Sequence, residues 1–158
     1  MRTALVTGAA RGIGLETAKQ FLADRWQVAL LDIDGPALDA AAAALDAPER
    51  VLALTCDVAM DAQVGAAFAD VATRFGRLDA LVNNAGTAVF KPVGETTPDE
   101  WRRVVDVNLT GPFLCMQSAV PLMSPGGAVV NIASISGQRA STLRVAYGTS
   151  KAGLMHLT

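Results

Sequence analysis

The stretch from Arg2 to Gly14, RTALVTGAARGIG, constrains the fold of this chain more than any other. It begins with an apolar run, Ala4–Val6, of the length and type of a buried parallel strand. The run ends at Thr7, glycines follow at positions 8, 12 and 14, and a helical pattern begins at Ile13. Such a turn makes an anion site, because outward-pointing helix N–H groups attract a phosphate and glycine lets it approach closely. The same turn also suits a plain strand-to-helix connection, so further motifs must decide between the two.

Apolar runs alternate with helical patterns along the rest of the chain. We expect strands at Ala4–Val6, Val28–Leu31, Val51–Leu54, Ala80–Val82 and Ala128–Ile132. Between them we expect helices at Ile13–Ala23, Pro36–Leu45, Asp61–Phe75 and Pro98–Met123. This alternation predicts right-handed βαβ units, and therefore an α/β fold with a doubly wound parallel sheet, Rossmann-like in class. The length of 158 residues suits a single domain over residues 1–158.

Composition argues against several classes of partner. The net charge is −2 with both signs interspersed, so we expect no nucleic-acid or anionic-membrane surface. The apolar runs are shorter than the roughly 18 residues of a membrane span, and the first strand starts too near Met1 for a signal peptide. Cys56 and Cys115 lack metal-ligand spacing, so we expect inert core thiols and no metal. These features predict a cytoplasmic protein.

A carboxylate, Asp32, ends the second expected strand 18 positions after Gly14 (32 − 14). Dinucleotide-binding folds place an acidic residue about 20 residues after the glycine loop, where it accepts hydrogen bonds from the adenosine ribose. A carboxylate there repels a 2′-phosphate, which favours NAD over NADP. Arg11 in the loop favours NADP instead, because a cation could form an ion pair with the 2′-phosphate. Alternatively, Asp32 is a solvated strand end or a helix cap together with Asp34.

Three motifs occur in a fixed order: TGAARGIG at Thr7–Gly14, Asp57-Val58 after the third strand, and Asn83-Asn84-Ala85-Gly86 after the fourth. Together they resemble the TGxxxGxG loop, the adenine-side pair and the NNAG motif of the short-chain dehydrogenase/reductase family. The resemblance implies the strand order 3-2-1-4-5 and NAD as cofactor. It also implies that the cofactor is bound by Gly8, Arg11, Gly12, Ile13, Gly14, Asp32, Asp57, Val58, Asn84, Ala85, Gly86, Tyr147 and Lys151.

Tyr147 and Lys151 are four positions apart, so on a helix they share one face. An ammonium about 4 Å from a phenol can lower the phenol pKa from about 10 by a few units, which makes tyrosine a usable acid and base. Ser134 is expected at the carboxyl end of the last strand, taken as Gly127–Ser134. The family resemblance implies that Ser134 binds the substrate oxygen, Tyr147 transfers the proton, and Lys151 lowers the tyrosine pKa and binds the nicotinamide ribose. The implied reaction is reversible hydride transfer between NAD and a secondary alcohol or ketone.

Asn108 follows Val104 and Val105 on the apolar face of the expected long helix. A buried amide needs hydrogen-bond partners, and two interpretations supply them. In one, Asn108 bonds to the backbone beside a kink at Gly111-Pro112. In the other, implied by the resemblance, it holds a water that joins the active-site lysine to solvent.

Two other functions fit parts of the pattern. One is a cofactor-binding module without catalysis, although such a module would be expected to lose Ser134, Tyr147 or Lys151. The other is a sugar-nucleotide epimerase or dehydratase, which shares the YxxxK pair but has a different glycine loop and no NNAG motif.

The resemblance also implies a homo-oligomer, a dimer or tetramer, packed through the helix from Pro98 and the helix of Tyr147. Chains of that family continue beyond the tyrosine–lysine helix, so we expect the C-terminal part of the family fold to be absent from residues 1–158.

Overall fold

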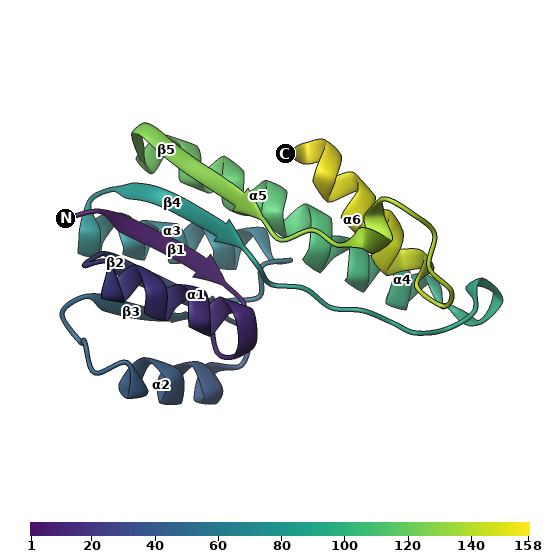
Figure 1. The fold of residues 1–158 in the computed structure, drawn as a ribbon, viewed down its shortest axis with the longest axis horizontal. Helices are drawn as coiled ribbons and strands as arrows, with labels where there is room; N and C mark the ends of the chain where they lie inside the picture. Colours follow the sequence, from purple (N-terminus) through teal and green to yellow (C-terminus); the bar gives the residue numbers. More distant parts are fainter.

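The computed structural model describes residues 1–158, apart from the side chain of residue 124. Its centre is a sheet of five parallel strands in the order β3-β2-β1-β4-β5 (Figure 1). The strands are β1 (Thr3–Thr7), β2 (Gln27–Asp32), β3 (Val51–Thr55), β4 (Leu78–Asn83) and β5 (Met123–Asn131). The predicted Rossmann-like α/β class and the predicted strand order are confirmed.

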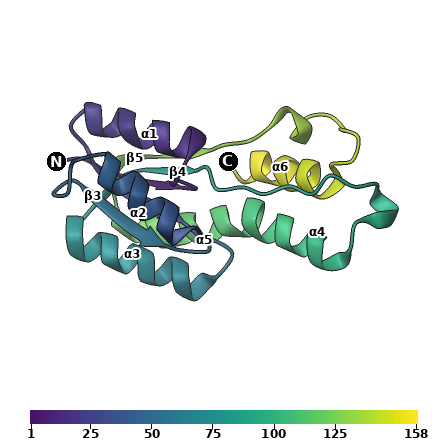
Figure 2. The same cartoon turned by 90° about the horizontal axis from the view of Figure 1, so that it is seen from below.

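Helices cover both faces of this sheet, as Figure 2 shows. On one face lie α1 (Gly12–Ala23) and α2 (Gly35–Ala44), and on the other lie α3 (Asp61–Phe75) and α5 (Gly111–Ala119). Successive strand residues point to opposite faces. In β1, Leu5 therefore packs with residues of α3 and α5, whereas Val6 packs with residues of α1 and α2. This double burial explains why the strands are apolar runs without alternation.

The helix expected over Pro98–Met123 is not one regular helix. It consists of α4 (Pro98–Val105), a π-helical segment η2 (Asp106–Thr110), α5 and the 3₁₀ turn η3 (Val120–Leu122), and Met123 already belongs to β5. The Gly111 N–H donates to the Asp106 carbonyl, five residues back. Pro112 has no N–H to donate to the Asn108 carbonyl, so the regular ladder breaks here and the chain takes one wider turn.

The fifth strand also differs from its prediction. It begins at Met123, earlier than the expected start at Ala128, and it ends at Asn131, before the expected end at Ile132 or Ser134. Ser134 instead precedes the 3₁₀ turn η4 (Ile135–Gly137), where its hydroxyl accepts the Ser136 N–H at 3.2 Å. A hydroxyl that satisfies a local N–H favours this turn over continued strand pairing.

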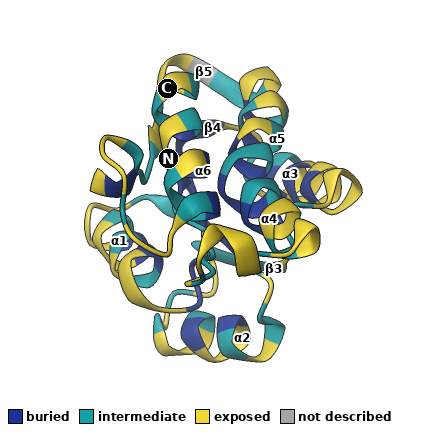
Figure 3. Cartoon of the chain, turned by 90° about the vertical axis from the view of Figure 1, so that its right-hand side faces the viewer, coloured by how far each residue is buried: buried dark blue, intermediate teal, exposed yellow. Residues whose placement is uncertain are grey.

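The last helix, α6 (Val145–Leu157), packs against α4, the π segment and the turn η4. Both α4 and α6 lie beyond the carboxyl ends of the strands (Figure 1). Their outward faces carry many exposed residues, as the view from that end shows (Figure 3). Ligands of open α/β sheets bind at this edge. None of the helices described here is long and apolar enough to cross a membrane.

Candidate active site

The glycine loop between β1 and α1 is shaped by two different requirements. A Cβ on Gly14 would lie 2.2 Å from the Gly8 carbonyl oxygen, so position 14 needs glycine for packing. Gly12 has a φ of +57°, yet a Cβ built there would meet nothing within 4 Å. Helix α1 also begins without a side-chain cap at Arg11. Open space next to uncapped helix N–H groups fits a phosphate-binding cradle.

A polar clamp joins this loop to the end of β4. The Asn84 side-chain amide donates to the carbonyl oxygens of Thr7, at 3.0 Å, and Gly8, at 3.1 Å. In return, the Thr7 hydroxyl accepts the N–H groups of Asn84 and Ala85, each at 3.0 Å. The sequence motif located Asn84 and Ala85, but nothing in the sequence marked the Thr7 hydroxyl as their partner.

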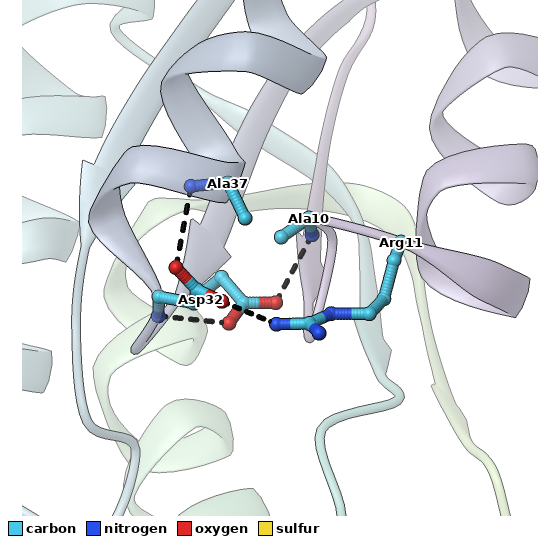
Figure 4. Close-up of polar contacts among 5 residues, drawn as sticks. Ala10, Arg11, Asp32 and Ala37 are labelled. Atoms are coloured by element: carbon cyan, nitrogen blue, oxygen red, sulfur yellow. Dashed lines mark hydrogen bonds and ion pairs between the residues drawn. The ribbon is translucent and has the colours of Figure 1, made fainter.

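Asp32 ends β2 beside the glycine loop, and its carboxylate is fixed by two backbone groups (Figure 4). Its Oδ2 accepts the Ala10 N–H at 3.0 Å, and its Oδ1 accepts the Asp34 N–H at 3.1 Å. The N-cap of α2 is Asp34, which accepts the Ala37 N–H at 3.2 Å. Arg11 also pairs with Asp34 and not with Asp32. The acidic residue at the expected position is therefore not the helix cap.

A cavity of about 460 Å³ borders Asp32, Asp57, Val58 and the glycine loop. Asp57 accepts the Ala59 N–H at 3.0 Å through Oδ1, and its Oδ2 lies 2.7 Å from a guanidinium nitrogen of Arg103 on α4. Arg103 also lines this cavity, and no sequence motif marks it, because it lies 46 positions after Asp57. The cavity has the position and size for the adenosine end of a dinucleotide.

A second cavity, of about 350 Å³, is lined by Tyr147, Lys151, Ile13 and Gly86. Lys151 is almost fully buried; its Nζ donates to the Ile132 carbonyl at 2.6 Å and lies 5.8 Å from the centroid of the Tyr147 ring. Burial lowers the pKa of the Lys151 ammonium below its usual value. The i, i+4 pair therefore faces one cavity, as the spacing predicts, and the ammonium is also held by Ile132, the residue directly after β5.

Asn108 lies within the π segment and is fully buried. Its amide nitrogen donates to the Thr87 carbonyl at 2.9 Å and to the Ser150 hydroxyl at 3.1 Å, and its Oδ1 accepts the Thr87 N–H at 2.8 Å. A Cβ built on Gly86 would lie 3.4 Å from Asn108 Oδ1 and 3.8 Å from Lys151 Nζ. Backbone bonding thus satisfies the amide, as one of the two interpretations expects, and Asn108 and Lys151 flank the same glycine.

Of the four predicted catalytic residues, Tyr147 and Lys151 line the tyrosine cavity, whereas Asn108 and Ser134 do not. The lining does include Ile132 and Ala133, which directly precede Ser134. Its hydroxyl oxygen accepts the Ser136 N–H, which leaves the hydroxyl hydrogen available to another acceptor.

The two cysteines are buried side chains rather than reactive groups. Burial raises the pKa of Cys56 to about 11, with a smaller contribution from Asp57, and raises the pKa of Cys115 to about 12. Both are therefore protonated thiols at neutral pH. Among the described residues, no group of three or more histidine, cysteine, aspartate or glutamate side chains is placed to hold a metal ion.

The fold agrees with the comparisons to known proteins. The model of the family "short chain dehydrogenase" matches residues 2–158, and the chain belongs to this oxidoreductase family, whose members use NAD(P). It is 41% identical over 160 residues to 2-dehydro-3-deoxy-L-rhamnonate dehydrogenase (NAD(+)) of Sphingomonas sp. (strain SKA58), covering 99% of this chain and 63% of the relative. It is 38% identical over 160 residues to galactitol 2-dehydrogenase of Agrobacterium fabrum, again covering 99% of this chain and 62% of the relative.

Solved structures give the same result. A short-chain dehydrogenase/reductase from Brucella melitensis, described as a glucose/ribitol dehydrogenase, superimposes with a TM-score of 0.97 at 33% identity. The match covers 99% of this chain and 67% of that structure. The chain thus spans somewhat less than two thirds of the length of the two curated relatives above.

Proposed function

We propose that the protein transfers a hydride reversibly between NAD and a secondary alcohol or ketone. One observation supports this most: the two cavities share Asn84, Gly86 and Thr87, so the adenosine-sized cavity leads directly to the cavity of Tyr147 and Lys151. The glycine cradle lies between them. A dinucleotide lying along this path would have its adenosine at one end and its reactive ring at the other.

The cofactor would be held by residues of four strand ends. The glycine loop supplies backbone N–H groups to the phosphates, Asp32 accepts hydrogen bonds from the ribose, and Asp57 and Val58 border the adenine. When bound, NAD supplies the site that accepts or gives up the hydride. Lys151 binds the second ribose. The full set is Gly8, Arg11, Gly12, Ile13, Gly14, Asp32, Asp57, Val58, Asn84, Ala85, Gly86, Tyr147 and Lys151.

Proton transfer is assigned to the groups around the smaller cavity. The Tyr147 hydroxyl takes the proton of the substrate alcohol during oxidation and returns it during reduction. The Lys151 ammonium, close to the ring, stabilises the phenolate. Ser134 does not line this cavity, but its hydroxyl hydrogen is available, and we assign it as the donor to the substrate oxygen. Asn108 fixes the backbone at Thr87 beside Lys151 and thereby completes the path along which the lysine exchanges its proton with water.

The preference for NAD over NADP rests on Asp32. Its carboxylate is held in place by two N–H donors, so it cannot turn away from a 2′-phosphate. The Arg11 guanidinium is paired with Asp34, which partly neutralises the one cation in the glycine loop. The rhamnonate-type relative named above carries NAD(+) in its name, in agreement with this assignment.

The sharpest test uses the fact that the chain contains one tyrosine. Tyr147→Phe should leave NAD affinity within about twofold and lower turnover of secondary alcohols by at least ~10²-fold, the effect of losing a general acid–base. Turnover of Tyr147→Phe near that of the parent would refute the mechanism.

We also propose that the protein is a homo-oligomer, a dimer or tetramer. Large apolar side chains are exposed on the helical segment from Pro98, namely Trp101, Phe113 and Val120, at 37%, 47% and 68%. Burying such side chains against a second copy would be favourable. Sedimentation at micromolar concentration should show a dimer or larger, and Phe113→Glu should shift it towards monomer. A monomeric parent protein would contradict the proposal.

A further inference from the structure

Arg144 places a second cation at the tyrosine cavity. It is the residue immediately before α6 and lines this cavity together with Phe90. Its guanidinium carbon lies 5.0 Å from the centroid of the Phe90 ring. Arg144 also borders a neighbouring cavity, but Phe90 does not. The guanidinium therefore lies beside Phe90, a residue that lines the cavity of Tyr147 and not the neighbouring cavity.

The Arg144 guanidinium has no partner of opposite charge within the part of the chain that the structure describes. Among the described residues, no carboxylate forms an ion pair with Arg144, and its side chain donates no hydrogen bond to them. No aspartate or glutamate lines the tyrosine cavity, whose other charged group is Lys151. The start of α6 adds the positive end of a helix dipole. A cavity with cations and no acid attracts an anion.

Backbone contacts hold Arg144 in this place. The Gly148 N–H donates to the Arg144 carbonyl at 2.7 Å, which fixes it to the turn that carries Tyr147. The Lys91 N–H donates to the Leu143 carbonyl at 3.0 Å, and Lys91 forms a β-bridge with Arg144. Leu143 has a φ of +59°, a left-handed conformation that is unfavourable for a leucine. The structure around Arg144 therefore maintains a strained residue directly before it.

We propose that Arg144 binds a carboxylate on the substrate, so that the protein acts on hydroxy acids and their oxo-acid counterparts. This inference rests on the proposed function, since the carboxylate is placed on the same molecule whose alcohol meets Tyr147. A guanidinium forms two parallel hydrogen bonds with a carboxylate, which fixes orientation as well as position. With Arg144 and Tyr147 three residues apart on one turn, the acid group holds one end of the substrate and the tyrosine reacts at the other.

The experiment compares each hydroxy acid with the matching uncharged amide. Secondary alcohols that carry a carboxylate two to five carbons from the carbinol are assayed with NAD beside the matching primary amides, using the full chain. Arg144→Gln should lower kcat/KM for the acids by about 10- to 100-fold and leave the amides within about threefold, as expected for a lost charged hydrogen bond. Arg144→Lys should restore part of the preference. Arg139→Gln, in the same loop but lining only the neighbouring cavity, is the matched control and should change neither.

A binding measurement separates this inference from the proposed reaction. Ligand-observed NMR with cyclohexanecarboxylate and cyclohexanecarboxamide, in the presence of NAD, should show binding of the acid that Arg144→Gln removes. If no alcohol is oxidised but the acid binds through Arg144, the proposed reaction fails and the anion site stands. If the parent oxidises acids and amides equally, or if Arg144→Gln and Arg139→Gln behave alike, the inference is overturned. Preference for phosphate esters over carboxylates would likewise overturn the carboxylate assignment.

Discussion

Arg11 of the glycine loop forms its ion pair with Asp34, two residues beyond the carboxylate that ends β2. The two carboxylate oxygens of Asp34 have different partners. Oδ1 accepts the Ala37 N–H and so caps α2, and Oδ2 accepts a hydrogen bond from the Arg11 guanidinium. Asp32 is thereby left with backbone partners alone. Two acids of one loop therefore have different partners: Asp32 accepts backbone N–H groups only, and Asp34 pairs with Arg11 as well as capping α2.

Replacing Asp34 by asparagine should weaken the discrimination against NADP. Asparagine caps helices as well as aspartate does, so α2 is preserved while the charge that pairs with Arg11 is lost. We expect the ratio of kcat/KM for NAD to that for NADP to fall by about fivefold, the effect of one unit charge on a phosphate roughly 7 Å away in water. Asp99→Asn, which breaks an exposed ion pair with Arg102 on α4, is the control. An unchanged ratio in Asp34→Asn would mean that Arg11 does not reach the 2′-position.

Alanine at Gly12 should impair cofactor binding more than folding. Open space at this position admits a methyl group, so the cost is the left-handed φ, about 1 kcal/mol. The methyl group would occupy the space that a phosphate approaches, and we expect NAD affinity to fall by at least about tenfold. Gly126→Ala is the matched control, because Gly126 has a φ of +85° and equal space far from the loop. Calorimetric titration measures the NAD affinity, and thermal unfolding measures the stability. Equal NAD affinity in the two variants would contradict the proposal that a phosphate binds beside Gly12.

Asp79 should stabilise the protein in a pH-dependent way. It accepts the Thr3 N–H at 2.9 Å and two bonds from Arg77, and the Arg77 hydrogen bond is the main cause that lowers its pKa. Because the pKa is lower in the folded state, this stabilisation is present above the unfolded value of about 4 and is lost as the pH falls through the folded value. Asp79→Asn should therefore lower the free energy of unfolding by about 1–2 kcal/mol at pH 7 and by less at pH 3. Urea unfolding tests this, with the exposed Asp39→Asn as control; a difference that does not vary with pH would exclude the ionic explanation.

Both cysteines should resist modification in the folded protein. With pKa values of about 11 and 12, they are thiolates in at most about one molecule in 1,000 at pH 8. We expect iodoacetamide to label neither within an hour at pH 8, and to label both within minutes in guanidinium chloride. Mass spectrometry counts the labelled sites. Rapid labelling of native Cys56 would show that the cavity beside Asp57 opens to solvent.

The sequence predicted the features that local patterns determine. Apolar runs between helical patterns predicted the parallel sheet, and the family resemblance implied its strand order. The spacing of Tyr147 and Lys151 correctly predicted a shared helix face. The end of β5 could not be predicted from the sequence, because Ile132 and Ala133 are as apolar as the strand itself. The strand ends where the Ser134 hydroxyl accepts the Ser136 N–H and favours a turn. The ion pair of Arg103 with Asp57 could not be predicted from the sequence either, since it depends on how α4 packs beside the end of β3.

One hydroxyl group holds the glycine loop to the strand end that leads into the tyrosine cavity. Because Thr7 accepts the N–H groups of both Asn84 and Ala85, the glycine loop and one wall of the tyrosine cavity are held together. The loop with Arg144 is attached elsewhere, through Lys91 and the start of α6. Substitutions in the Arg144 loop can therefore change the shape of the tyrosine cavity without disturbing the glycine loop, so that these two parts of the proposed site can vary independently.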